Sequence, residues 1–178
     1  MRLLAILGLL VTLLAGCWSE GKPAHREGVT DADIRFSLEM IPHHEQTLRL
    51  AELAGLRSAD EVVTKTAEAI ARSESAEIQT MKSWLAAWQV NAPAGNAHAG
   101  HAMPGMLTER EFEALDAAGG TEFDRLWMTT LAKHLRAGVQ MAKDVQVNGT
   151  HEGTKALARE IVTAQEAKLS ELESMGRV

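Results

Sequence analysis

Three side chains that can bind a soft or borderline metal stand close together near residue 40. Met40 is followed three and four positions later by His43 and His44. In a helix this spacing puts the thioether and both imidazoles on one face. Such a set suits a transition metal, copper above all, as Cu(I) or Cu(II). The alternative is that Met40 belongs to an ordinary core and that the histidines are satisfied polar residues.

A second histidine lies in a comparable helical pattern further along the chain. His134 falls on the apolar seam of a helix expected over about 121–147, and Met141 follows on the same seam. We therefore count His134 and Met141 among the candidate metal ligands.

Polar residues also interrupt the apolar stripes of the two other long helices that the sequence predicts. Glu74 and Glu77 lie on the stripe of one helix, and Gln165 and Lys168 take the corresponding places in the last. Buried carboxylates are costly unless they are paired. Glu74, Glu77 and Gln165 could orient metal-bound imidazoles through hydrogen bonds. Alternatively, Glu77 pairs with Lys168 and Glu74 with Gln165, in a polar layer that only sets the helix register.

Residues 91–107 form a segment rich in Ala, Gly, Asn and Pro that predicts a loop. It carries His98, His101, Met103 and Met106. Two imidazoles and two thioethers could serve Cu(I) as an accessory site. The alternative is a solvated connector in which these side chains are incidental.

The elements that must position these side chains occur twice. A shift of 91 positions superposes many identical residues, among them Thr30 and Thr121, Asp33 and Asp124, His43 and His134, and Ile70 and Ile161. One ungapped offset through two helices of each half indicates a duplicated hairpin. The composition is rich in Ala, Leu and Glu, with few aromatics and no tyrosine. Together these features predict an all-α four-helix bundle over residues 30–178, with repeats at 30–90 and 121–176.

The N-terminus predicts an export signal over residues 1–16. Arg2 precedes an apolar core, Leu3 to Leu14, which is shorter than the ~20 residues of a membrane-spanning helix. The core leads into Leu-Ala-Gly before Cys17, a sequence that resembles a bacterial lipobox. That resemblance predicts cleavage before Cys17, a lipid on its thiol, and a tether over 17–29. The alternative is a plain secretory signal followed by a free thiol.

Charge and cysteine content exclude several classes of function. The formal net charge of −6 and the lack of a basic face argue against a nucleic-acid partner. A single cysteine allows neither an intrachain disulfide nor a thiolate metal cluster. No nucleophile triad, phosphate loop or redox-cofactor motif occurs in the sequence. We therefore predict no catalytic residue and expect a protein that is not an enzyme.

Several motifs together resemble the family catalogued as domain of unknown function 305. They are Met40-Ile-Pro-His-His-Glu45, Phe123-Asp-Arg-Leu126, Lys133-His134, Met141-Ala142, Glu77-Ile78 with Met81, Trp84 and Leu85, and Met-Pro-Gly-Met at 103–106. The resemblance covers about residues 31–176. It implies a ferritin-like fold, export, and copper binding through Met40, His43 and His44, because the family includes periplasmic copper-binding proteins tied to copper resistance.

The second histidine block departs from the family pattern. The family tends to carry His-His there, whereas here Leu135 and Arg136 follow His134. A guanidinium beside the block disfavours cation binding. We therefore expect one competent site, or an asymmetric one.

These observations lead to one preferred function and two alternatives. The preferred one is a lipid-anchored copper-binding protein on the periplasmic face, for copper buffering, chaperoning or resistance, with other copper-handling proteins as candidate partners. The first alternative is a metal-free helical interaction bundle. The second is a ferritin-like di-iron oxidase, which would need Glu-x-x-His motifs. Glu39 precedes His43 by four residues, so this second alternative is the weaker.

Overall fold

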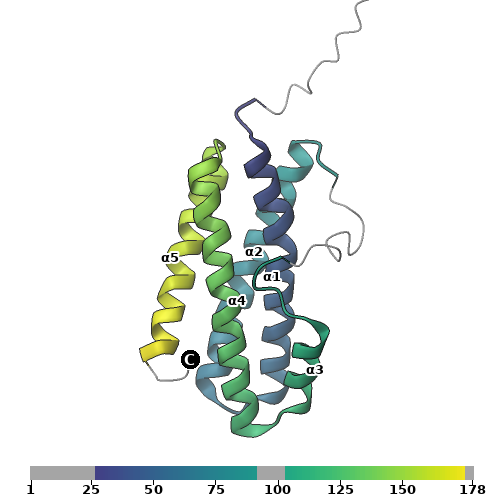
Figure 1. The fold of residues 1–178 in the computed structure, drawn as a ribbon, viewed down its shortest axis with the longest axis vertical. Coiled ribbons are helices and arrows are strands. Elements are labelled where there is room, and N and C mark those ends of the chain that lie inside the picture. Colours follow the sequence, from purple (N-terminus) through teal and green to yellow (C-terminus); the bar gives the residue numbers. More distant parts are fainter. Residues whose placement is uncertain (1–26, 92–102, 175–178) are drawn as a thin grey trace, which may run out of the picture.

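The computed structural model describes residues 27–91 and 103–174. Within these ranges the chain forms four long helices, one short helix and no strand (Figure 1). The helices are α1 (Asp31–Arg57), α2 (Glu61–Ala87), α3 (Glu109–Ala117), α4 (Gly120–Asn148) and α5 (Glu152–Ser174). The predicted all-α four-helix bundle of two helical hairpins is confirmed. The signal segment, Cys17, most of the tether, His98 and His101 lie outside the described residues.

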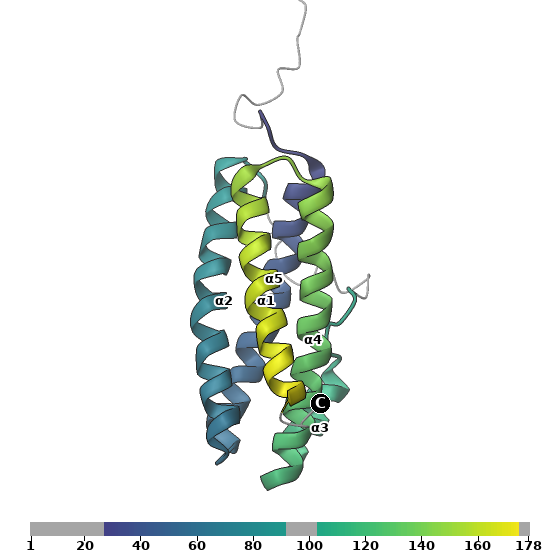
Figure 2. The same cartoon turned by 90° about the vertical axis from the view of Figure 1, so that its left-hand side faces the viewer.

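The bundle is built by packing one hairpin on the other. α1 packs against α2, α4 packs against α5, and α1 also lies along α4. Neighbouring long helices run in opposite directions (Figures 1 and 2). The connection from α2 to α4 joins opposite ends of the bundle, and the short helix α3 lies on it near the start of α4.

Local sequence signals begin two of the helices. Thr30 caps α1 in a reciprocal capping box with Asp33, and Thr108 caps α3 in the same way with Glu111. In each box a side chain satisfies a free backbone N–H of the first turn, and a carboxylate favours the positive end of the helix dipole.

The two hairpins are tied together at equivalent places. The Asp33 carboxylate accepts hydrogen bonds from the backbone N–H groups of Thr150 (3.0 Å) and His151 (3.3 Å), in the connection between α4 and α5. Asp124, its counterpart in the repeat, accepts the Ser58 hydroxyl in the connection between α1 and α2. These matching contacts show that an approximate two-fold axis relates the hairpins.

The core forms two apolar clusters, one toward each end of the bundle. One contains Leu50 with Trp127 and Leu131, together with Phe112 of α3. The other contains Met40 with Met81, Ala142 and Ile161. The inward-facing positions of α1 recur at helical spacing and are all buried, namely Phe36, Met40, His43, Thr47, Leu50 and Ala54. In the described part of the chain, no helix has the length and apolar character needed to cross a membrane.

Candidate metal site

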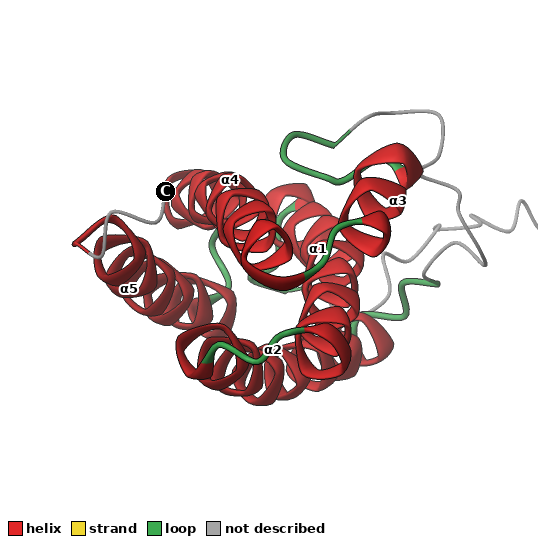
Figure 3. Ribbon diagram, turned by 90° about the horizontal axis from the view of Figure 1, so that it is seen from below, coloured by secondary structure: helices red, strands yellow, loops and turns green. Residues whose placement is uncertain are grey.

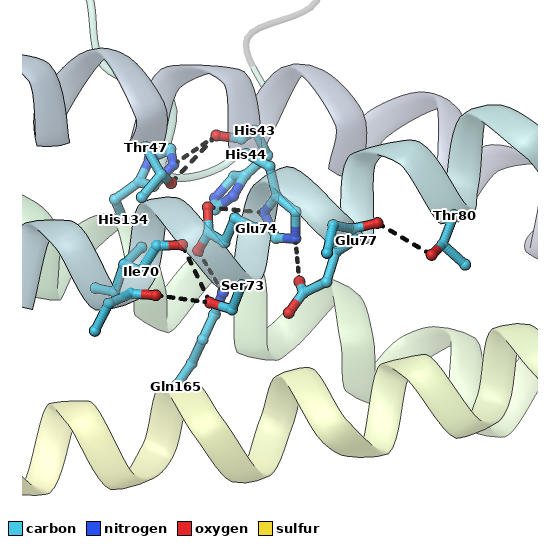
Figure 4. Close-up of polar contacts among 12 residues, drawn as sticks. His43, His44, Thr47, Ile70, Ser73, Glu74, Glu77, Thr80, His134 and Gln165 are labelled. Atoms are coloured by element: carbon cyan, nitrogen blue, oxygen red, sulfur yellow. Dashed lines mark hydrogen bonds and ion pairs between the residues drawn. The ribbon is translucent and has the colours of Figure 1, made fainter.

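A layer of buried polar side chains crosses the middle of the bundle between the two apolar clusters (Figure 4). All four long helices contribute to it: α1 supplies His43 and His44, α2 Glu74, α4 His134 and α5 Gln165. The three histidines are completely buried, and Glu74 and Gln165 are only 3% and 6% exposed. Burial of this many polar groups is costly unless they are paired or used.

His43 and His134 lie on the approximate two-fold axis. Their rings stack with centroids 3.6 Å apart and planes 13° from parallel. A residue can contact its own equivalent in the repeat only near the axis, and His43 contacts its equivalent, His134. Gly138 makes room for the layer, because a Cβ at that position would come within 3.0 Å of His43 Cε1 and 2.8 Å of Gln165 Oε1.

His43 has two free ring nitrogens. Neither Nδ1 nor Nε2 has a hydrogen-bond partner among the residues that the structure describes. Burial lowers the pKa of His43 well below its usual 6.5, and the neighbouring His134 and His44 lower it further. The ring is therefore neutral and keeps a lone pair, which is the form that binds a metal.

His134 is more constrained than His43. Its Nδ1 lies 3.0 Å from the Gly105 carbonyl oxygen and its Nε2 3.0 Å from the His43 carbonyl oxygen. Burial lowers the pKa of His134, so the ring is neutral and carries a single N–H. It can donate to only one of these carbonyls. Metal binding at His134 would require the ring to give up one of the two contacts.

His44 lies between two carboxylates. Its Nδ1 is 3.2 Å from Glu74 Oε2, within ion-pair range although not aligned as a hydrogen bond, and its Nε2 is 2.7 Å from Glu77 Oε2. Burial acts to lower the pKa of His44, but Glu74 and Glu77 outweigh it and the net pKa is raised. Burial raises the pKa of Glu74 to about 7, although the His44 charge opposes this. The cluster therefore retains a proton near neutral pH.

A metal ion on His44 would have to displace that proton and one carboxylate. The other carboxylate would remain on the second ring nitrogen and orient the imidazole, as acidic partners of metal-bound histidines do. Glu74 is itself held by Gln165, whose Nε2 donates to its Oε1 over 3.2 Å.

One of the two alternative pairings predicted from the sequence is wrong. Glu74 and Gln165 do meet, but Glu77 pairs with His44 instead of Lys168. Lys168 pairs with Glu171, one turn along its own helix. Glu77 and Lys168 occupy equivalent positions and line the same pocket, but each has a different partner close by.

Met40 and Met141 belong to the same apolar cluster but differ in burial. Met40 is fully buried on α1, one turn before the histidines. Met141 is half-buried and lines a pocket of about 210 Å³ between α1 and α4, together with Phe36 and Glu39. The lining of that pocket includes no histidine, and the role of Met141 as a ligand stays a prediction.

Part of the predicted loop is docked on the bundle next to His134. Met103 and Met106 are half-buried and flank Gly105, whose φ is +80° and whose carbonyl meets His134. The Gln46 side chain holds the Leu107 backbone through two hydrogen bonds, Nε2 to the carbonyl (2.9 Å) and Oε1 from the N–H (2.8 Å). No pattern in the sequence predicts the roles of Gln46, Gly105 and Gly138. Where the backbone approaches another element closely, a glycine is the only sign in the sequence.

The donor groups fit copper in type but are not assembled around one point. The described residues contain no group of three or more His, Cys, Asp or Glu side chains arranged to hold a metal ion. The rings of His43 and His44 have centroids 6.2 Å apart. Because imidazole nitrogens bind metals at about 2 Å, both rings could reach one ion once His44 releases a carboxylate. Neutral imidazole and thioether donors in a dry layer suit Cu(I) best.

Solved structures of similar proteins share this fold. A DUF305 protein of Streptomyces coelicolor, described as secreted, has a TM-score of 0.74 and 28% identity over 81% of this chain and 89% of its own. CopM in the Cu(II)-bound form has a TM-score of 0.71 and 28% identity, over 80% of this chain and 94% of that one. CopM in the Cu(I)-bound form has a TM-score of 0.68 and 25% identity over the same shares.

The family itself is identified by a match to a family model. No curated protein sequence matches the chain. The family model described as domain of unknown function (DUF305) matches residues 33–176, as the motifs predicted. The chain therefore belongs to the DUF305 family.

Proposed function

We propose that this protein binds copper, as Cu(I) in preference to Cu(II), and buffers or chaperones it outside the cytoplasm. Met40, His43 and His44 supply the ligands, and His134 supports His43 by stacking on it. Glu74, Glu77 and Gln165 orient the histidines. Residues 103–106, together with His98 and His101, form an accessory site at most. Met141 is neither a ligand nor one of the residues that orient the histidines.

His43 is the single observation on which the proposal rests. A buried imidazole with both nitrogens unpartnered among the described residues costs stability unless something binds it. An imidazole with this environment is neutral and therefore ready to bind a cation. His44 lies one residue away, and the acidic side chains around it can accept the charge of the ion.

The similarity to CopM supports copper in particular. CopM is a protein of the same fold with structures bound to Cu(II), Cu(I) and Ag. Silver binding there is consistent with soft ligands, because Ag(I) and Cu(I) favour the same thioether and imidazole donors.

Export and lipid anchoring complete the proposal. The signal-like segment, residues 1–16, and the lipobox-like cysteine support them, as does the secreted description of the Streptomyces coelicolor relative. Residues 17–29 would tether the bundle, residues 30–178, to the membrane surface.

A metal-free bundle is the second candidate, and the contacts of His44 favour it. In the structure both nitrogens of His44 face carboxylates, and Glu74 is held in turn by Gln165. Such a network can set helix register and partner choice without a metal.

The test is a titration of the full chain in detergent with Cu(I), against a competing chromophoric chelator, and with Cu(II) in parallel. Met40→Leu is expected to weaken Cu(I) binding by at least about tenfold. Met141→Leu makes the same chemical change on α4 and is expected to leave binding unchanged. Leu and Met have similar volumes, so neither variant should lose much stability. Equal affinity of wild type and Met40→Leu, or no binding by the wild type, would favour the metal-free bundle.

A further inference from the structure

A pocket of about 160 Å³ opens between α2 and α5, on the side of the bundle where these two helices face each other. Figure 3 views the bundle along its length, with α2 and α5 as neighbours on one side. The other neighbouring long helices, by contrast, pack closely along one another.

The pocket lies on the approximate two-fold axis. Its lining includes four pairs of repeat-equivalent residues: Ile70 and Ile161, Ser73 and Ala164, Glu74 and Gln165, and Glu77 and Lys168. A pocket lined by both members of each pair is centred on the axis. The stacked pair His43 and His134 lies on the same axis, so the pocket points toward the buried histidines.

The floor of the pocket connects with the histidine layer through polar atoms. Glu74 Oε2 and Gln165 Oε1 are buried and lack hydrogen-bond partners in the described ranges. Glu74 Oε2 faces His44 Nδ1 over 3.2 Å, and Gln165 and His43 both approach Gly138, where a Cβ would lie 2.8 Å from Gln165 Oε1 and 3.0 Å from His43 Cε1. At the mouth, Glu77 is 16% exposed and already bonds His44. A cation entering this pocket would meet the side-chain oxygens of Glu77, Glu74 and Gln165.

The opposite side of the layer is covered. There the turn around Gly105 packs on α4, so closely that a Cβ on Gly105 would lie 2.1 Å from Ala137 Cβ. Gln46 holds the next part of this segment at Leu107. An ion could reach His134 from that side only if the turn moved away.

We propose that this axial pocket is the route by which a soft monovalent cation reaches His43 and His44, with Glu77 binding it transiently at the mouth and the Lys168 ammonium slowing its passage. This inference rests on the proposed function of the site. Lys168 stands where the repeat has Glu77, is 22% exposed, and adds a positive charge to a channel otherwise lined by acidic and neutral groups.

The experiment measures uptake and release of Cu(I) by the full chain in detergent. Uptake is followed by stopped-flow mixing, and release by transfer into an excess of a chromophoric Cu(I) chelator. Ala164→Trp fills the mouth from an exposed position on the rim, and Ser73→Trp does so from the other helix. A blocked route slows both directions and leaves the equilibrium unchanged. We expect both rates to fall by about tenfold or more with Kd within about twofold.

Two controls separate the route from general effects. Thr163→Trp adds the same bulk at an exposed position of α5 that does not line the pocket, and should leave both rates unchanged. Lys168→Met is expected to speed uptake by roughly three- to tenfold. Lys143→Met removes an equal charge from a surface ion pair with Glu166 and should have little effect.

The outcomes distinguish this inference from the proposed function. If the wild type binds no Cu(I) at equilibrium, the proposed function fails. If binding is intact but both tryptophan variants at the mouth exchange metal at the wild-type rate, the route is wrong. Faster exchange in Gly105→Ala, together with unchanged rates in Ala164→Trp, would place the route on the α1–α4 side instead.

Discussion

His43 combines two properties that oppose each other in the metal-free protein. Its neutral ring suits a metal, yet its unpartnered nitrogens in a dry layer weaken the fold. His43→Leu is therefore expected to raise the free energy of unfolding by about 1 kcal/mol while abolishing most Cu(I) affinity. Denaturant melts and chelator competition on the same samples test this. A loss of stability together with unchanged affinity would show that His43 is structural.

His44 responds differently because it is paired. Leu135 holds the position in the second half that is equivalent to His44. The surroundings differ, because His44 faces Glu74 and Glu77, whereas the residues equivalent to these two carboxylates in the second half are Gln165 and Lys168. His44→Leu therefore leaves a buried carboxylate without its partner.

We therefore expect His44→Leu to lower the free energy of unfolding by about 3 kcal/mol at neutral pH and to lose copper binding. Adding Glu74→Gln and Glu77→Lys copies the second half of the chain and should restore most of the stability without restoring binding. Thermal and denaturant melts of the single and triple variants decide this. A triple variant no more stable than the single one would contradict the explanation.

At the scale of elements, the turn around Gly105 joins the predicted loop to the histidine layer. Its positive φ and its contact with Ala137 exclude any side chain without a shift of the turn. Gly105→Ala should cost about 1–3 kcal/mol of unfolding free energy. Gly55→Ala is the matched control, since its Cβ would meet nothing within 4 Å inside helix α1. That control should be neutral or slightly stabilising, and equal effects in the two variants would show that the turn is not fixed.

Asp33 links the start of α1 to the connection between α4 and α5. Burial acts to raise its pKa, but hydrogen bonds from Thr30, Thr150 and His151 outweigh this and lower the pKa below 3.8. A carboxyl with a depressed folded pKa contributes stability above its unfolded pKa and loses it as the pH falls through the folded value.

Asp33→Asn should therefore cost about 1–2 kcal/mol at pH 7, and the difference from wild type should shrink below pH 3.8. Denaturant melts across this pH range provide the measurement. Asp124→Asn is the natural control in the second repeat and should cost less, because Asp124 meets the other hairpin through the Ser58 hydroxyl and not through two backbone N–H groups. A pH-independent cost at Asp33 would contradict the assignment.

For the whole molecule, we expect the bundle to be held at a membrane surface by a lipid on Cys17. Intact-mass measurement of protein extracted from membranes should give a chain that begins at Cys17 and carries the added lipid mass. Cys17→Ala should release the protein from the membrane and leave Cu(I) affinity unchanged. A mature chain beginning at another residue would rule out the lipobox.

The sequence alone determined the architecture and the members of the polar layer. Helical periodicity, the capping residues Thr30 and Thr108 and the 91-residue offset depend on local chemistry and on duplication, and both can be read along the chain. The inward-facing α1 positions followed from the same period, because in an amphipathic helix burial depends on angular position. The family motifs, which pointed to copper, can also be read along the chain, because each is a short run of residues.

Only the tertiary structure decided how the polar side chains pair. Glu77 pairs with His44 and Lys168 with Glu171, although the two residues are equivalent in the repeat and line the same pocket. It also placed Met141 beside a pocket between α1 and α4 and brought Gly105 onto His134. These contacts join residues far apart in the sequence, and the positions of whole helices set their distances. No local pattern records such distances, so only the packed bundle shows which histidine is held and which is free.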